Sequence, residues 1–214
     1  GGATYTNNPL LKKIMLSMRD WGRDCWCESG VDNTCGRRFS QKFGELPLGY
    51  DHKYVYSHFG FNLKASDMQA AVGCAQIDKF SSFVQHRRQN FKKLYDGLKA
   101  IKELILVKAQ PHSEPSWFGF MMTVADGAKF SRNELSEHLE KAGVQTRNLF
   151  AGNMIKHPLF AELKLGEDYK ISGEVKNTDK IMSDSFWVGV YPGMSDEKIE
   201  YIIKVIKEFI SAKS

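Results

Sequence analysis

From about residue 85 onward, segments with the apolar spacing of a helix alternate with segments typical of strands, and this alternation constrains the fold more than any other feature of the sequence. The strand-like runs are rich in β-branched and aromatic residues and read LILVKA, WFGFMMTVA, VQTRNLF and SFWVGVYPG. A capped helix is predicted from Ser131 to Gly143, because Ser131 and Glu134 match an S-x-x-E capping box. A last helix is predicted over SDEKIEYIIKVIKEFISAK, whose apolar side chains share one face. Such an alternation predicts an α/β or α+β layer domain.

Residues 1–80 contain two further helical patterns separated by a long loop. PLLKKIMLSMRDWGRD has apolar residues at intervals of three and four, and Gly22 predicts the end of this helix. A second helix is predicted to begin at ASDMQAAVGCAQIDKF, where Ser66 and Gln69 match an S-x-x-Q capping box. Apolar residues lie almost all round it, which predicts burial between layers or subunits, with Cys74 as one of the buried residues. A separate basic helix is expected after a kink near Ser81.

The charge pattern excludes some classes of partner. The net charge of +5 is modest, and the densest basic stretch, HRRQNFKKLYDGLKAIK, is interpreted as the solvated face of a helix. A nucleic-acid surface would need a longer basic stripe or a named motif, so no nucleic-acid partner is expected. The sequence has neither a run of about 18 apolar residues nor a basic-then-apolar leader. We therefore expect a cytoplasmic protein with no membrane partner. The opening GGATYT has a strand-and-turn pattern, which is typical of the middle of a protein.

Three of the four cysteines, Cys25, Cys27 and Cys35, lie in DCWCESGVDNTCGRRF with the spacing C-x-C-x7-C. The Gly, Asp and Asn residues around them predict a loop, and GELPLGYDHKYVY is expected to continue it into a short extended segment. A disulfide reading needs an oxidising compartment and leaves one cysteine over. Zinc sites usually show C-x2-C pairs, whereas an iron–sulfur cluster held by four thiolates would accept three from one loop and one from elsewhere. The spacing favours metal or cluster binding and leaves ordinary loop cysteines as the alternative.

A second candidate feature is SHFGFNLKASDMQAAVG, in which Asn62 precedes the predicted helix cap. One interpretation is a side chain that closes a turn ahead of the helix. The other is a polar side chain held near a helix N-terminus, where phosphate groups are often bound. Taken alone, the segment favours the turn.

Several segments, in order along the chain, together resemble one family. They are GGATYT, MRDWGRDCWC, DNTCGRRF, GYDHKYVYSHFGFNLKASDMQAAVG, PSWFGF, TRNLFAGN and NTDKIMSDSFWVGVYPG. The family is that of the CDP-4-keto-6-deoxy-D-glucose-3-dehydrases, the RfbH type of lipopolysaccharide biosynthesis protein, which is an offshoot of the DegT/DnrJ/EryC1/StrS sugar aminotransferases. NLKASDMQAAVG alone indicates the wider aminotransferase group, whereas the C-x-C-x7-C loop is typical of the dehydrase.

The resemblance implies an α/β fold of the aspartate aminotransferase type, as in other PLP-dependent transferases. Residues 1–80 would be the C-terminal remainder of the large cofactor-binding domain, and residues 81–214 the small α+β domain. Because family members are much longer, the chain is expected to be a C-terminal fragment. The remaining half would carry most of the cofactor pocket and the histidine that takes the place of the usual Schiff-base lysine.

The resemblance also implies two cofactors: pyridoxamine or pyridoxal 5'-phosphate, and a 2Fe–2S cluster. The resemblance implies that the cluster is bound by Cys25, Cys27 and Cys35, and that its fourth cysteine ligand is absent from this chain. We therefore expect the chain alone to bind the cluster weakly or not at all. The reaction would remove the C3 hydroxyl of a CDP-linked 4-keto-6-deoxyhexose. The cofactor ring would serve as an electron sink, and the cluster would pass two electrons, one at a time, from a flavin/iron–sulfur reductase.

Further site residues follow from the resemblance. In the wider group, the asparagine that matches Asn62 reaches across a homodimer to the cofactor phosphate, so a homodimer is expected. The adjoining residues expected to line the same pocket are Ser57, His58 and Phe61. Arg147 or Asn153 would meet the nucleotide-sugar, with an ordinary surface or strand-edge role as an equal alternative. Many sugar aminotransferases have a histidine within the segment that matches TRNLFAGN, whereas this chain has Phe150 and Ala151, which favours a dehydrase.

Two alternatives remain at this point. One keeps the fold and makes the protein a lysine-bearing nucleotide-sugar aminotransferase with incidental cysteines. The other is a non-catalytic metal-binding or interaction module. The residue that precedes GGATYT would separate the two enzymes, since a histidine indicates the dehydrase and a lysine the aminotransferase. A start codon near Gly1 would favour the module.

Overall fold

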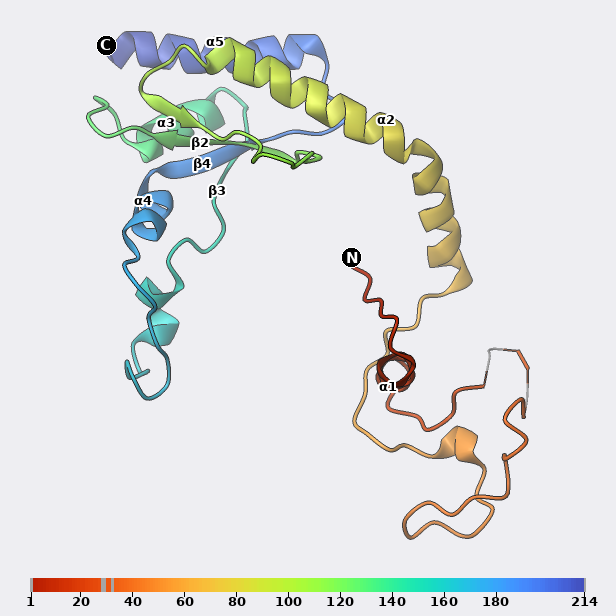
Figure 1. The fold of residues 1–214 in the computed structure, drawn as a ribbon. Coiled ribbons are helices and arrows are strands. Elements are labelled where there is room, and N and C mark those ends of the chain that lie inside the picture. The colour runs from red at the N-terminus through yellow and green to blue at the C-terminus, as the bar shows by residue number, and fades with distance from the viewer. Residues whose placement is uncertain (1, 28–29, 32, 214) are drawn as a thin grey trace. The chain divides into compact units, whose positions relative to one another are not determined.

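A computed structural model describes residues 2–27, 30–31 and 33–213 of the chain (Figure 1). The chain divides into two compact units, Gly1–Cys74 and Ala75–Ser214, and each is described by itself. The division falls inside helix α2 (Asp67–Leu98), a few residues before the domain boundary predicted at residue 80. The assignment of the two parts to a large and a small domain stays a prediction.

The second unit is built on a four-stranded antiparallel sheet with the strand order β1-β2-β4-β3. Its strands are β1 (Leu104–Leu106), β2 (Gly119–Val124), β3 (Thr146–Asn148) and β4 (Ser185–Gly189). Each strand lies inside one of the four runs that the sequence predicts. The expectation of a mixed α and β layer domain is therefore confirmed.

Helices cover one face of this sheet (Figure 1). Buried and half-buried residues alternate along β2, so that Phe120 and Met122 point to the same face. There they pack with apolar residues of α2, α3 (Arg132–Lys141) and α5 (Asp196–Lys213). Burial of each large apolar side chain contributes roughly 1.5–3 kcal/mol, so this layer of residues is the main source of stability in the unit.

The predicted amphipathic helices are confirmed in this unit. Ser131 caps α3 in a reciprocal capping box with Glu134. The apolar face of α5 packs into the core of the unit. Its residue Ile203 is half-buried, and the others are buried: Ile199, Ile202, Ile206, Phe209 and Ile210. α5 approaches α2 closely at Gly97, where a Cβ atom would lie 2.4 Å from Ile203 Cδ1.

The helix α4 (Lys176–Asp184) was not predicted from the sequence. Its segment KNTDKIMSD contains only two apolar residues, Ile181 and Met182, and no side chain caps its N-terminus, so the sequence offered neither a repeated apolar spacing nor a cap signal. α4 contacts β2 and β4, and the segment between β3 and α4 contains two short 3-10 turns, Met154–Lys156 and Pro158–Phe160.

Helix α2 joins the two helices that the sequence predicted, because Asp67–Leu98 is one continuous element. Ser82 Oγ donates to the Lys79 carbonyl at 2.8 Å, a back-bond to the preceding turn of the kind that often accompanies a bend, and the kink near Ser81 and Ser82 stays a prediction. The capping box at the start of the helix is confirmed: Gln69 Oε1 accepts from the Ser66 N–H at 2.9 Å, and Ser66 Oγ accepts from the Gln69 N–H at 3.4 Å.

The first half of α2 is exposed, so it is not buried between layers of this chain, and the alternative prediction of burial between subunits stays a prediction. Its apolar side chains are largely in solvent, with exposures of 80% for Met68, 64% for Val72, 73% for Ile77 and 63% for Phe80. Cys74 is also exposed. The pattern was apolar enough for burial, but no described residue of this chain packs against these side chains.

Part of the basic stretch on α2 has a structural role that its sequence did not reveal. Arg87 Nη1 donates to the carbonyls of Trp117 at 3.0 Å and Val190 at 3.3 Å, which connects the helix to the ends of β2 and β4. Arg88 Nη2 donates to the Glu114 carbonyl at 2.6 Å. These two cations hold loops in place, so the stretch is less free than the solvated helix face that was predicted.

The first unit begins with α1 (Pro9–Arg19), whose N-terminus is capped by Asn8. After α1 the chain continues in loops with a 3-10 turn at His52–Tyr54, within the stretch that was predicted to run from a loop into a short extended segment. Val55 after the turn is extended, and Tyr56 forms an isolated bridge with Arg23. Backbone bonds join the end of α1 to the segment before α2: the Trp21 N–H donates to Phe61 O at 3.0 Å, and the Phe61 N–H to Met18 O at 2.7 Å. No helix among the described residues is long and apolar enough to cross a membrane.

Candidate functional site

The cysteine loop and the 3-10 turn after it bring thiols and one imidazole together in the first unit. Among the described residues, one ligand atom from each of Cys25, Cys27 and His52 lies within 4.8 Å of the others. Cys35 Sγ lies 3.3 Å from His52 Nε2. All four cysteines of the chain are free thiols, so no disulfide competes with this arrangement.

His52 is the member of this cluster that the sequence analysis missed. Its exposed fraction is 1%, whereas the three cysteines of the loop are half-buried. The segment DHKY contains turn residues followed by aromatic residues, and it was interpreted as the approach to an extended segment. A histidine in a loop that follows a cysteine run was the available signal, since imidazole is a common metal ligand.

Local contacts fix the turn that carries His52. Asp51 accepts from the Lys53 N–H at 3.1 Å, which caps the 3-10 turn. Arg38 donates to Asp51 Oδ2 from Nε at 3.0 Å and from Nη2 at 2.7 Å, so the loop that carries Cys35 is tied to the same turn. The Arg38 hydrogen bonds are the main reason that the pKa of Asp51 is lowered. This ion pair connects the segment that follows Cys35 to the turn that carries His52.

The two ring nitrogens of His52 face different partners. Nδ1 lies 3.4 Å from the carbonyl oxygen of Asp24, which can only accept, so the contact assigns the ring proton to Nδ1. In that tautomer the lone pair of Nε2 is directed at the cysteine side of the cluster. A histidine whose second nitrogen is bonded to a backbone carbonyl is the usual arrangement in metal sites.

The cluster alters the acidity of its thiols in opposite directions. Hydrogen bonds from the Thr34 side chain and then from the Cys35 backbone lower the pKa of Cys27 to about 6. Burial is the first cause that raises the pKa of Cys25, and the neighbouring Cys27 charge adds to it. Because the thiolate is the form that binds metals, Cys27 is prepared for that role at neutral pH.

The segment Ser57–Asn62 lies on the surface of the first unit. The N–H groups of Ser57 and His58 both donate to Gly22 O, at 2.9 and 3.3 Å, and all of the predicted cofactor-binding side chains are exposed. Asn62 forms an isolated antiparallel bridge with Asp20, and its amide makes no hydrogen bond with a described residue. The side chain is therefore available to a group that this chain does not supply.

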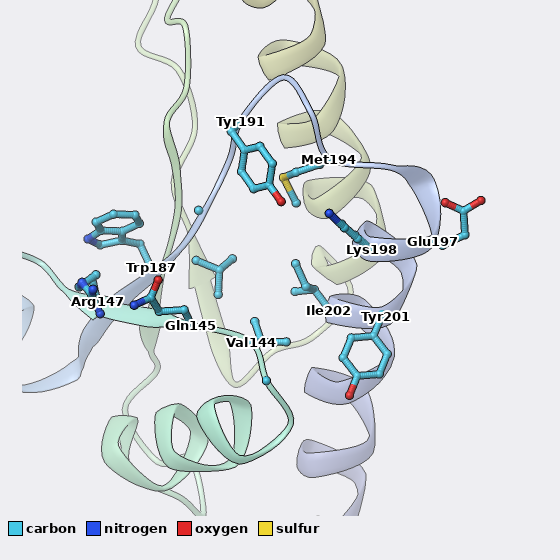
Figure 2. A pocket seen from close by; sticks show the side chains of 13 residues that line it. Val144, Gln145, Arg147, Trp187, Tyr191, Met194, Glu197, Lys198, Tyr201 and Ile202 are labelled. Atoms are coloured by element: carbon cyan, nitrogen blue, oxygen red, sulfur yellow. The ribbon is translucent and has the colours of Figure 1, made fainter.

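The two predicted substrate residues lie in the second unit and differ in their surroundings. Asn153 is 3% exposed, its Nδ2 donates to Asp179 Oδ1 at 2.6 Å, and its Oδ1 accepts from the Ile155 N–H at 3.3 Å. These contacts give it a structural role in the segment before α4. Arg147 lies on β3 and lines a cavity of about 740 Å³ together with Trp187 and Lys198 (Figure 2). Its Nη1 donates to the Thr146 carbonyl at 3.1 Å, and with the amide of Gln145 turned over, the Gln145 oxygen accepts from Arg147 Nη2 at 2.8 Å. Gln145 lines the same cavity.

A family model matches residues 1–207 of the chain, and it is that of the DegT/DnrJ/EryC1/StrS aminotransferase family. The chain belongs to this family.

Two longer proteins are similar to this chain over nearly all of its length. The lipopolysaccharide biosynthesis protein RfbH of Salmonella typhimurium is 50% identical over 210 residues, which are 98% of this chain and 47% of RfbH. The dTDP-4-dehydro-2,6-dideoxy-D-glucose 3-dehydratase of Saccharopolyspora spinosa is 47% identical over 214 residues, which are 100% of this chain and 46% of the relative. The chain spans about half the length of these curated relatives.

A solved structure confirms the fold expected for the aminotransferase family. The GDP-4-keto-6-deoxy-D-mannose-3-dehydratase of E. coli, with bound hydrated PLP, has a TM-score of 0.73, and the match covers 94% of this chain and 48% of that chain. At 22% identity, this likeness shows the fold alone. The predicted resemblance to a PLP-dependent transferase of the aspartate aminotransferase fold is confirmed.

The resemblance to the family implies a metal cluster and a pyridoxal cofactor, and the described residues can be compared with the needs of each. For a metal, the cluster offers thiols and a buried imidazole, which are the donor types that zinc and iron–sulfur centres use. For the phosphate of a pyridoxal cofactor, the exposed and unbonded amide of Asn62 is a suitable donor. The cysteine cluster therefore fits a metal, and Asn62 fits a phosphate whose other contacts come from outside this chain.

Proposed function

We propose that this chain is part of a nucleotide-sugar 3-dehydratase that depends on pyridoxamine 5'-phosphate and a 2Fe–2S cluster. The observation that carries the proposal is the convergence of Cys25, Cys27 and Cys35 near His52 in a member of an aminotransferase family. Transamination alone has no use for a thiol cluster, whereas removal of a hydroxyl with net reduction needs a source of single electrons. The name of the relative from Saccharopolyspora spinosa supports the 3-dehydratase class.

In this proposal the cysteine loop supplies ligands of the cluster. Cys25, Cys27 and Cys35 provide three thiolates, and a fourth cysteine comes from outside this chain. When bound, pyridoxamine phosphate would supply an electron sink and the cluster would supply one-electron transfer. Residues of this chain hold the loop in place: the Arg38–Asp51 ion pair ties the end of the loop to the turn that carries His52. The lowered pKa of Cys27 favours its thiolate form.

The proposal gives the segment before α2 a role in binding the pyridoxal cofactor. The free amide of Asn62 would donate to the phosphate of the cofactor in the partner subunit of a homodimer. The adjoining pocket residues proposed with it are Ser57, His58 and Phe61. The exposed apolar half of α2 supports the homodimer, since apolar patches on this scale mark interaction surfaces.

The remaining partners belong to the same proposal. The substrate is a CDP-linked 4-keto-6-deoxyhexose that loses its C3 hydroxyl in dideoxysugar biosynthesis, and Arg147, in its cavity, is the better of the two predicted substrate contacts because Asn153 is occupied within the chain. Electrons come from a flavin/iron–sulfur reductase. The enzyme acts in the cytoplasm, where free thiols persist.

The test is the content of iron and acid-labile sulfide per chain, after anaerobic reconstitution of the full-length protein proposed to carry this chain. We expect two irons per full-length chain and little in the present chain alone. Cys27→Ala should remove the iron and the reductase-dependent formation of product, while pyridoxamine phosphate still binds. Cys74→Ser is the matched control and should keep the iron.

Two results would count against the proposal. An iron-free full-length protein that transfers an amino group would favour the aminotransferase with incidental cysteines. A Cys27→Ala variant that forms product at the normal rate with the reductase would show that the cluster assignment is wrong.

A further inference from the structure

We propose that the cavity of the second unit binds the nucleoside diphosphate part of the substrate, with Arg147 and Lys198 as its phosphate contacts. The inference deepens the proposed function and rests on it for the class of substrate. The cavity has a volume of about 740 Å³, and all of the residues that line it belong to the second unit. Sites for small molecules have volumes of roughly 300–1,000 Å³, so the cavity has the size of such a site.

The inner surface of the cavity is apolar and fixed by the core of the unit. Its buried residues come from β4, from α5 and from the segments that precede β3 and α5: Val144, Val188, Met194 and Ile202. Two exposed aromatic rings, those of Tyr191 and Tyr201, stand beside this surface (Figure 2). The Tyr201 hydroxyl donates to the Ala142 carbonyl at 2.9 Å, which holds its ring in place. An apolar surface bordered by aromatic rings suits the planar ring of a base.

Two cations reach the cavity from different elements, Arg147 from β3 and Lys198 from α5. Figure 2 shows the Lys198 amine directed towards the other lining side chains, whereas the Glu197 carboxylate points away from them. Ser195 is the main reason that the pKa of Glu197 is lowered, which accounts for that carboxylate at the start of α5.

Neither cation of the cavity forms a salt bridge with a carboxylate among the residues that the structure describes, and Arg147 influences Glu140 only through its charge. Their charges are therefore available to a ligand. A guanidinium binds phosphate through two parallel hydrogen bonds, and an ammonium binds it as a point charge. Arg147 and Lys198 thus supply the charge that a diphosphate needs next to the apolar surface.

Trp187 contributes a donor that lacks an acceptor. Its Nε1 is buried and makes no hydrogen bond with any residue in the described part of the chain. The ring cannot turn freely, because its centroid lies 5.2 Å from that of Phe118 and a Cβ atom at Gly119 would lie 2.8 Å from it. A buried N–H without an acceptor costs about 1–3 kcal/mol. Since Arg147 pairs with Trp187 across β3 and β4, a phosphate oxygen held by the guanidinium can also reach this N–H.

The experiment is a calorimetric titration of the 214-residue chain with CDP. We expect one CDP per chain, with weaker binding of cytidine and of inorganic phosphate because each supplies only part of the contacts. Added salt should weaken the binding of CDP, since it screens the phosphate contacts. Lys198→Gln and Arg147→Gln each remove one charged donor and should each weaken CDP binding roughly tenfold or more.

Two further variants make the result specific. Lys207→Gln removes the same charge from an exposed position of α5 outside the cavity, so it should bind CDP as the parent chain does. Gly189→Leu places a side chain in the cavity from β4, where a Cβ atom would meet nothing within 4 Å. This variant should abolish CDP binding without a change in the circular dichroism spectrum. It separates occupation of the cavity from a general attraction of anions to the surface.

Three outcomes would overturn the inference: no saturable binding of CDP at millimolar concentrations, equal binding of inorganic phosphate and CDP, or unchanged binding of CDP by Gly189→Leu. The iron and sulfide content of the full-length protein is measured separately. A full-length protein with its two irons, together with a chain that does not bind CDP, would remove this inference and leave the proposed dehydratase. A chain that binds CDP, from a full-length protein without iron, would keep the nucleotide site and remove the cluster.

Discussion

At the scale of single residues, the charged pairs on the surface of this chain show how one side chain can serve two elements. Glu134 accepts from the Ser131 N–H at 2.8 Å at the start of α3 and pairs with Lys213 at 2.8 Å at the end of α5. The Lys213 hydrogen bond and then the Ser131 bonds lower the pKa of Glu134 to about 2. The carboxylate joins the first turn of one helix to the last turn of another.

This arrangement predicts an acid-dependent loss of stability. Since the folded pKa is below the unfolded value, the contribution of Glu134 is present above about pH 5 and is lost as the pH falls towards 2. We therefore expect the unfolding free energy of the parent chain to exceed that of Glu134→Gln at neutral pH, and the difference to shrink through this window. Urea unfolding at a series of pH values measures it. Glu137→Gln, at an exposed position of the same helix, should show no such dependence; a constant difference for Glu134→Gln would contradict the assignment.

The candidate site shows which residues a sequence can indicate and which it cannot. The spacing of Cys25, Cys27 and Cys35 indicated a metal or cluster site because thiols crowded on one loop have few other uses. His52 escaped notice because its position beside them depends on a tertiary turn held by Arg38 and Asp51. The resemblance to the family placed Asn62 on the cofactor, which no contact within this chain tests.

At the scale of elements, the second unit was predictable because its core follows short periods in the sequence. Alternation along β2 and the three-and-four spacing of α5 both select the face that is buried. The same reasoning failed for α4, whose segment has few apolar residues and no capping side chain. It also divided α2 into two helices, whereas Asp67–Leu98 is one continuous helix. The spacing of apolar residues predicts a helix or strand well where that spacing matches the face of the element that is buried.

The core beneath α3 makes a quantitative prediction. Leu139 is fully buried in the second unit, so Leu139→Ala should lower the free energy of unfolding by about 2–5 kcal/mol through lost burial and an unfilled cavity. Leu159→Ala, at a position that is 58% exposed, should change it by much less. Denaturant unfolding followed by circular dichroism measures both. Equal effects would show that Leu139 is not part of the cooperative core.

At the scale of the whole molecule, the chain is similar to about half of each of two longer relatives and has a row of exposed apolar residues. Met68, Val72, Ile77 and Phe80 follow one another along the first half of α2 without a described partner. The sequence predicted that these residues are buried between layers or subunits. They are exposed in this chain, so burial between subunits is the part of that prediction that remains.

The proposed homodimer gives this surface a test. In the full-length protein, Ile77→Glu would place a charge on the apolar surface and should shift the dimer towards monomer by at least tenfold in dissociation constant, which corresponds to about 1.4 kcal/mol. Light scattering over a dilution series measures the change. Ser211→Glu adds the same charge at an exposed position on α5 and should leave the dimer intact. An unchanged dimer in the first variant would remove α2 from the interface.

Because α2 is a single helix with one end in a core and the other in solvent, its backbone should not be protected uniformly. Asn90, Phe91, Leu94 and Leu98 are buried, whereas the residues from Met68 to Phe80 are exposed. Local opening of a helix is cheap where few apolar contacts hold it. Amide hydrogens should therefore exchange with deuterium quickly in the first turns of α2 and slowly near its C-terminus. The fast amides should slow only when a second surface covers them, so the exchange profile of this one helix would report how complete the surrounding assembly is.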